Sequence, residues 1–121
     1  MAKKIFFFYA IFLISLREAT SQCDVSQIDV HQTNTGKVVK GKPEWRVTIT
    51  NPCICTFIEI QLNCKGFQSA EKVDSSLLAL SGDACLLTNG QPLHGKESTS
   101  FSYAWTTQFT FKPISATIGC S

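Results

Sequence analysis

The stretch Cys53-Ile54-Cys55-Thr56-Phe57-Ile58-Glu59-Ile60-Gln61-Leu62-Asn63-Cys64 decides the kind of fold that this chain can form. From Ile58 onward, apolar and polar residues alternate, and cysteines stand at both ends of the stretch. Such alternation is typical of a β-strand that turns one face to a core and the other to water. The stretch therefore predicts a half-buried strand that is cross-linked at its ends.

The same alternation recurs along most of the chain, in residues 27–31, 44–49, 100–105, 108–112 and 114–120. Turn-forming residues separate these segments, at Asn34-Thr35-Gly36, Gly41-Lys42-Pro43, Asn51-Pro52, Ser81-Gly82-Asp83, Asn89-Gly90-Gln91-Pro92 and Lys112-Pro113. Residues 77–80 fit either a short strand or one helical turn. Short strands with frequent turns predict an all-β fold, here a small disulfide-stapled β-sandwich, with a β-barrel-like arrangement as the alternative.

The N-terminus has the three parts of a secretory signal peptide. Lys3 and Lys4 supply the positive start, and residues 5–16 form the apolar middle. Ala19 and Ser21 are small residues before a cleavage site. A membrane-spanning helix needs about 20 apolar residues, more than this run provides. We therefore expect residues 1–21 to be a cleaved signal peptide and residues 22–121 to be a single secreted, extracellular domain with no membrane segment.

The formal net charge of +2 belongs to the predicted signal peptide rather than to the exported domain. Residues 22–121 contain eight basic and eight acidic side chains, so their formal charge is near zero. A nucleic-acid-binding protein usually carries a basic stripe, and here only Lys37, Lys40 and Lys42 stand close together. We interpret these lysines as part of a solvated loop, and we expect no nucleic-acid partner.

All six cysteines follow the predicted cleavage site: Cys23, Cys53, Cys55, Cys64, Cys85 and Cys120. An even number in a short exported chain predicts a disulfide framework. Zinc motifs, the alternative, usually contain two close Cys or His pairs, and only Cys53 and Cys55 are close here. In a strand those two would lie about 6.5–7 Å apart, which disfavours a bond between them. We expect three structural disulfides and no metal. The sequence does not determine which cysteines pair, except that Cys53 and Cys55 should each have a distant partner.

Motifs of the common enzyme classes are absent from the sequence. It has no Gly-x-Ser-x-Gly elbow, no His-Glu-x-x-His helix and no phosphate-binding glycine loop. Three disulfides would leave no thiol for Cys–His catalysis. The acids are scattered, mostly at outward or loop positions, which favours solvation over a catalytic pair: Asp24, Asp29, Glu44, Glu59, Glu71, Asp74, Asp83 and Glu97. We predict that the protein is not an enzyme and has no cofactor.

A longer pattern runs through residues 22–121. It includes Cys53-x-Cys55, Cys64-x-Gly66-Phe67, Gly90-Gln91-Pro92-Leu93 and Ser100-Phe101-x-Tyr103-Ala104. In this order the pattern resembles the plant tapetum-determinant family of small secreted cysteine-rich proteins. The resemblance implies a protein ligand in the apoplast that binds the ectodomain of a leucine-rich-repeat receptor kinase and directs cell fate in the anther.

Two sets of candidate contact residues correspond to two kinds of partner. For a receptor, the candidates are Lys37, Lys40, Lys42 and Gln91, and we expect the domain to be a monomer. For a cell-wall polysaccharide, the alternative partner, a flat aromatic platform would be formed by Trp45, Tyr103 and Trp105. The place of these aromatics in the alternating pattern favours burial, which weakens the alternative. A defence or inhibitor-type scaffold, in which the cysteines only add durability, is a third hypothesis.

Overall fold

The structure is a computed structural model that describes residues 23–120. The predicted signal peptide, residues 1–21, lies outside the described residues. Between residues 23 and 120, no helix is long and apolar enough to cross a membrane. In chain order the elements are η1 (Val25–Gln27), β1 (Asp29–Val39), β2 (Lys42–Thr50), β3 (Thr56–Asn63), β4 (Leu78–Ser81), β5 (Ala84–Leu87), η2 (Thr88–Gly90), β6 (Ser98–Ala104) and β7 (Pro113–Gly119), where η marks a short 3₁₀ helix.

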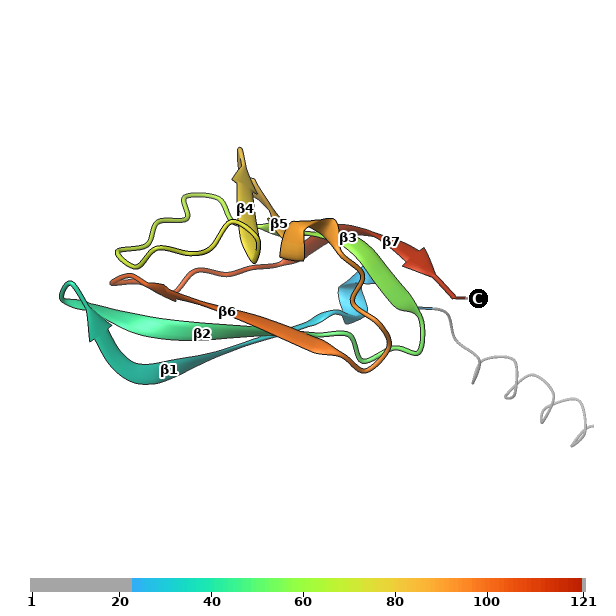
Figure 1. Ribbon diagram of the computed structural model, residues 1–121, viewed down its shortest axis with the longest axis horizontal. Helices are drawn as coiled ribbons and strands as arrows, with labels where there is room; N and C mark the ends of the chain where they lie inside the picture. Colours follow the sequence, from blue (N-terminus) through green and yellow to red (C-terminus); the bar gives the residue numbers. More distant parts are fainter. Residues whose placement is uncertain (1–22, 121) are drawn as a thin grey trace, which may run out of the picture.

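The strands form two layered sheets, as Figure 1 shows. The first sheet has the order β1-β2-β6, and the second has the order β4-β5-β3-β7. Neighbouring strands are antiparallel in both sheets. The two sheets do not close into a barrel, so the structure confirms the predicted β-sandwich rather than its alternative.

The core contains apolar side chains from both sheets. Val47 and Ile49 of β2 are fully buried, and Phe101 of β6 is 3% exposed. The second sheet adds Phe57, Ile60, Leu62, Leu78, Cys85 and Leu87, each at most 1% exposed. Burial of one large apolar side chain stabilises a fold by about 1.5–3 kcal/mol. The alternation of the sequence therefore predicts the main source of stability correctly.

β3 departs from the predicted alternation at its centre. Phe57 is fully buried, whereas Ile58 is half-buried. The register between β3 and β7 shifts after Ile58, and Glu59 has a φ of +54°. An extra residue in one strand of a pair disrupts the ladder locally and re-aims nearby side chains. This bulge therefore places Phe57 in the core together with Ile60, whereas strict alternation predicts that Ile58 is buried with Ile60.

Residues 108–112 do not form the strand that their alternation predicts. They connect β6 to β7 outside both sheets (Figure 1). Phe111 is nevertheless 1% exposed, and its ring meets Phe101 edge-on at a centroid distance of 5.3 Å. Alternation indicates that an extended chain has one buried and one exposed face, and it does not require pairing with a neighbour. The segment is therefore a loop that contributes to the core.

The β1–β2 hairpin is longer than predicted because residues 34–36 do not interrupt β1. The register shifts between Asn34 and Val38, and Gly36 adopts a φ of +84°. The expected break is thus a bulge within the strand, and the chain reverses at Lys40 and Gly41. Of residues 77–80, the last three belong to β4, which resolves the choice between strand and helical turn.

Candidate functional site

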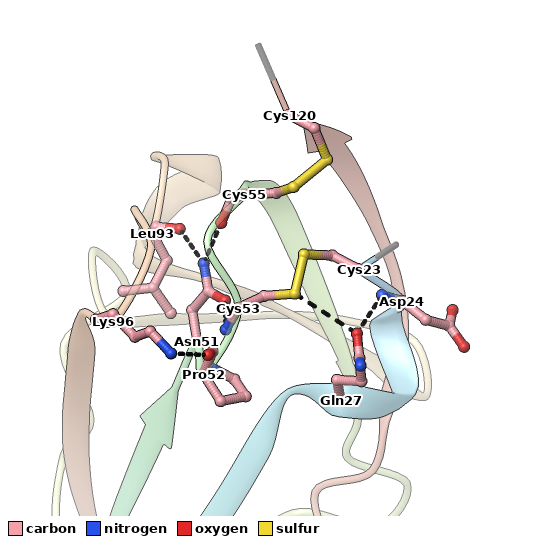
Figure 2. Close-up of a disulfide and its surroundings, with 10 residues drawn as sticks. All are labelled: Cys23, Asp24, Gln27, Asn51, Pro52, Cys53, Cys55, Leu93, Lys96 and Cys120. Atoms are coloured by element: carbon pink, nitrogen blue, oxygen red, sulfur yellow. Dashed lines mark hydrogen bonds between the residues drawn. A yellow bond between two sulfur atoms is a disulfide. The ribbon is translucent and has the colours of Figure 1, made fainter. Parts of the chain in front are cut away.

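Two disulfides join the ends of the domain to the segment that precedes β3 (Figure 2). Cys23 is bonded to Cys53, with a Cα–Cα distance of 6.0 Å. Cys55 is bonded to Cys120, with a Cα–Cα distance of 4.4 Å. The structure confirms that Cys53 and Cys55 have separate, distant partners. Both lie in a bend before β3 and not within a strand.

The third disulfide lies in the core between neighbouring strands. Cys64 follows β3 and Cys85 lies in β5, with a Cα–Cα distance of 5.9 Å. Their side chains are 2% and 0% exposed. All six cysteines are therefore paired, as the even number in an exported chain predicts.

Three of the cysteine sulfur atoms form a close group. The Sγ atoms of Cys23, Cys55 and Cys120 lie within 4.8 Å of one another. Thiolates are the form of cysteine that binds metal, and each of these sulfurs is bonded in a disulfide. Their proximity results from two adjacent disulfides, and their chemistry does not fit a metal site.

Asn51 holds the backbone around these two disulfides (Figure 2). Its fully buried side chain donates from Nδ2 to the carbonyl oxygens of Cys55, at 2.7 Å, and Leu93, at 3.0 Å. Its Oδ1 accepts from the backbone N–H of Cys53 at 2.9 Å. Buried polar groups in native proteins are almost always hydrogen-bonded, and here one side chain satisfies three backbone groups. The sequence indicates only a turn at Asn51, because Leu93 is remote along the chain.

The bend at residues 53–55 presents an apolar side chain to solvent. Ile54 is 84% exposed although both of its neighbours are disulfide-bonded. Gly95 packs so closely that an added Cβ would lie 2.9 Å from the carbonyl oxygens of Cys53 and Ile54. Lys96 donates from Nζ to the carbonyl oxygen of Pro52 at 2.6 Å. The bend is a constrained surface feature, and Ile54 is a candidate contact that the sequence pattern did not indicate.

The predicted contact lysines lie on the β1–β2 hairpin, at the end of the sandwich remote from the C-terminus (Figure 1). Lys37 and Lys40 are exposed. Lys42 is half-buried, and its Nζ lies 5.4 Å from the centroid of the Trp105 ring. An ammonium group is attracted to the face of an indole ring, so Trp105 helps to position Lys42. The hairpin therefore presents Lys37 and Lys40 most openly to a partner.

Gln91, the fourth predicted contact, is not beside the lysines. It is exposed and follows η2, which packs against β3, β4 and β5 of the second sheet. Figure 1 shows η2 well away from the tip of the β1–β2 hairpin. The structure thus brings three of the four predicted contact residues together and leaves Gln91 on a different part of the surface.

The aromatic residues of the alternative carbohydrate platform do not share an exposed face. Tyr103 is fully buried, and Trp45 and Trp105 are half-buried against the core. The Tyr103 hydroxyl donates to Oε1 of Gln32 at 2.7 Å and accepts from the N–H of Phe109 at 2.9 Å. Burial raises the pKa of the Tyr103 phenol, so the hydroxyl keeps its proton for this bond. The arrangement argues against a sugar-binding platform.

A groove of about 500 Å³ lies beside this network, between β1 and residues 108–113. Val30 and Gln32 line one side, and Phe109 and Lys112 are among the residues on the other. Gln32 also joins the two sides, because its Nε2 donates to the carbonyl oxygen of Phe109. The sequence did not predict the groove, since its walls come from opposite ends of the domain.

One of the acids that the sequence places at solvated positions is buried. Glu44 is 7% exposed, whereas Glu71, which lies between β3 and β4, is half-buried. Oγ1 of Thr35 donates to Oε1 of Glu44 at 2.8 Å. Interaction with Glu71 and the hydrogen bond from Thr35 lower the pKa of Glu44, whereas interaction with Glu44, together with burial, raises the pKa of Glu71. The expectation of an outward, solvated Glu44 is wrong, because its side chain is buried and its carboxyl group accepts a hydrogen bond from Thr35.

The family model described as Tapetum determinant 1, C-terminal, matches residues 24–120. The chain belongs to this family. The match includes every strand and five of the six cysteines of this family member. It confirms the resemblance that the cysteine spacing and the short motifs indicate.

Curated relatives from two plants are similar to this family member. TPD1 protein homolog 1 of Arabidopsis thaliana is 33% identical over 101 residues, covering 81% of this chain and 55% of the relative. TPD1 protein homolog 1B of Oryza sativa subsp. japonica is 31% identical over 106 residues, covering 86% of this chain and 62% of the relative. An uncharacterized Arabidopsis thaliana protein is 35% identical over 98 residues, covering 78% of this chain and 76% of the relative. The chain thus spans less than two thirds of both named homologs. No solved structure matches it.

Proposed function

We propose that this protein is a secreted, extracellular ligand for the ectodomain of a leucine-rich-repeat receptor kinase, with a role in cell-fate signalling of the anther and tapetum type. The observation that carries the proposal is the tapetum determinant 1 match across residues 24–120. The proposed mature domain is residues 22–121, after removal of residues 1–21. It acts as a monomer, without a cofactor and without catalysis.

The architecture supports a binding role. Three disulfides cross-link a sandwich of about 100 residues, so little conformational entropy is lost when a partner binds. A leucine-rich-repeat ectodomain offers an extended concave surface of a size suited to such a compact domain.

The β1–β2 hairpin is the proposed contact surface. Lys37 and Lys40 are exposed there, and Lys42 lies beside them over Trp105. The rest of the exported domain offsets their charge, so the domain as a whole is near neutral, while residues 37–42 contain three lysines and no acid. A local basic surface steers association with an acidic partner. We therefore expect an acidic patch on the ectodomain, with Gln91 contacting only a partner that also reaches η2.

A binding screen tests the proposal. The protein secreted from a eukaryotic host is passed over immobilised leucine-rich-repeat ectodomains, and association is measured at low and high salt. The double variant Lys37→Glu/Lys40→Glu should associate at least about tenfold more slowly at low salt, because the steering charge is reversed.

The matched control is Lys65→Glu/Lys112→Glu, which changes the net charge equally at exposed positions away from the hairpin. It should associate like the wild type. Equal loss in both double variants would reject the hairpin as the contact surface. Absence of binding to every ectodomain, combined with retention on cell-wall glucan, would overturn the ligand proposal in favour of carbohydrate binding.

A further inference from the structure

The two disulfides at the end of the domain, here called the outer disulfides, bring sulfur atoms of both bonds into one group (Figure 2). The Sγ atoms of Cys23, Cys55 and Cys120 lie within 4.8 Å of one another, although Cys23 is bonded to Cys53 and Cys55 is bonded to Cys120. A new S–S bond is about 2.05 Å long, so Cys55 and Cys23 would approach by less than about 3 Å to form one. A change of rotamer moves a cysteine sulfur by a comparable distance. The outer disulfides are thus close enough to exchange partners.

The cysteines of the outer disulfides differ in their access to solvent. Cys120 is exposed, whereas its partner Cys55 is only 7% exposed. Cys23 and Cys53 are half-buried. The course of thiol–disulfide exchange depends on which sulfur an attacking thiolate can reach. A thiol from solvent therefore meets the Cys55–Cys120 bond at Cys120, and Cys55 is the sulfur that leaves.

The remaining bond, here called the core disulfide, has neither property. Cys64 and Cys85 are 2% and 0% exposed, and neither belongs to the sulfur group. β7 is also paired with β3 by backbone contacts that reach as far as Thr56 and Gly119. We therefore expect the sandwich to stay assembled while the outer disulfides react.

We propose that the sulfur atoms of Cys23, Cys55 and Cys120 form a thiol-exchange site. A small thiol of the glutathione class opens the Cys55–Cys120 bond there, and Cys23 then exchanges its bond with Cys53 for a bond with Cys55. The site lies apart from the lysines of the proposed contact surface, and the proposal does not rest on the ligand function.

The exchange has two steps, and each step replaces one thiolate by another. The thiolate of the small thiol attacks Sγ of Cys120, a mixed disulfide forms there, and Cys55 leaves as a thiolate. Cys55 then attacks Sγ of Cys23, the Cys23–Cys55 bond forms, and Cys53 leaves as a thiolate. The proton that the small thiol lost returns to Cys53. The number of S–S bonds stays the same, so no oxidant or reductant is consumed.

Exchange alters the attachment of both ends of the domain. Cys120 carries the small thiol in place of its bond to Cys55, so the C-terminal end of β7 is held only by its pairing with β3. Cys23 becomes attached on the other side of Ile54, which is 84% exposed between the two bonded cysteines. The site thus couples thiols in the surroundings to the shape of a constrained part of the surface.

Peptide mapping of the secreted protein tests the site. The folded protein is incubated with reduced glutathione, quenched under mildly acidic conditions, labelled with N-ethylmaleimide and digested without reduction. Fragment-ion spectra distinguish Cys53 from Cys55. We expect glutathione on Cys120, the maleimide label on Cys53 and a new link between Cys23 and Cys55. The reaction should become about tenfold faster when the glutathione concentration is raised about tenfold, because the first step is bimolecular.

Two single variants give the decisive comparison. In Cys120→Ala, Cys55 loses its partner and supplies the attacking thiolate without any added thiol, so the label should divide between Cys55 and Cys53. The matched control is Cys85→Ala, which also leaves one free cysteine, Cys64, but outside the sulfur group. This control should keep both outer disulfides unchanged.

Three outcomes bear on the proposal. Label that stays on Cys55, with the Cys23–Cys53 bond intact in both the wild type and Cys120→Ala, would overturn it. Loss of the core disulfide at the same rate as the outer disulfides would also overturn it, because general reduction needs no particular site. Exchange in the wild type, with the core disulfide intact, upholds the proposal even if a variant fails to fold. Failure of ectodomain binding with the exchange intact would reject only the ligand function.

Discussion

At the scale of single residues, buried polar groups determine the details of this domain. Asn51 and Glu44 are its two buried polar or charged side chains among the described residues. Asn51 is hydrogen-bonded to three backbone groups, and Glu44 accepts a hydrogen bond from the Thr35 hydroxyl. A buried group left without its partner costs about 1–3 kcal/mol. These two residues therefore matter more for stability than their polar character in the sequence indicates.

Replacement of Asn51 by alanine should lower the free energy of unfolding by about 3 kcal/mol, because three backbone groups lose their partner at a fully buried site. Urea unfolding under non-reducing conditions measures the change. Asn63→Ala, which removes one exposed bond to the N–H of Lys65, is the control and should cost less than about 1 kcal/mol. Equal effects of the two substitutions would show that Asn51 does not organise the bend.

At the scale of elements, burial and strand pairing are separate properties. Residues 108–112 have the alternation of a strand and the burial of a strand, yet they pair with neither sheet. β3 pairs on both sides, yet its bulge interrupts the alternation. Hydrophobic periodicity depends on which face of an extended chain meets the core, and pairing depends on which backbone lies next to it. A segment can therefore have the hydrophobic periodicity of a strand without pairing as one, and a paired strand can lack strict periodicity.

The unpaired segment should contribute to stability as much as a strand does. Phe111→Ala should lower the free energy of unfolding by about 3–5 kcal/mol, because it removes a buried ring that packs against Phe101 and Phe67. Ile114→Ala, in β7 and 52% exposed, is the control and should cost less than about 1 kcal/mol. Guanidinium titration of both variants measures the difference. A small loss for Phe111→Ala would mean that residues 108–112 lie loosely on the core.

At the scale of the whole molecule, the two ends of the sandwich are built differently. One end is cross-linked by Cys23–Cys53 and Cys55–Cys120, which close loops of 30 and 65 residues. At the other end, the connection between β3 and β4, residues 64–77, is joined to the end of β6 by hydrogen bonds from Ala70 to Ala104 and from Ala104 to Ser69. The molecule thus has one end that is covalently cross-linked and one end that is held by hydrogen bonds.

Loss of a disulfide should cost more when the loop that it closes is longer, because the entropy of the freed loop grows with the logarithm of its length. Cys55→Ala/Cys120→Ala should lower the free energy of unfolding by about 4 kcal/mol, because unfolding of the variant frees a 65-residue loop. Cys64→Ala/Cys85→Ala, with a separation of 21 residues, should lose about 3 kcal/mol plus packing in the core. Denaturant unfolding and secreted yield measure both. Since total stability is about 5–15 kcal/mol, unchanged yield and stability in either variant would refute a structural role for that bond.

The sequence by itself determined the all-β class, the apolar faces of most strands, the oxidised state of the cysteines and the family. These properties depend on local periodicity, on residue counts and on the order of short motifs. Only the tertiary structure decided which cysteines pair, that Tyr103 is buried rather than offered to sugar, that Gln91 lies apart from the lysines, and that Glu44 is buried. The physical reason is that each of these depends on how residues remote along the chain are placed by the packing of two sheets and by the path of the connections between them.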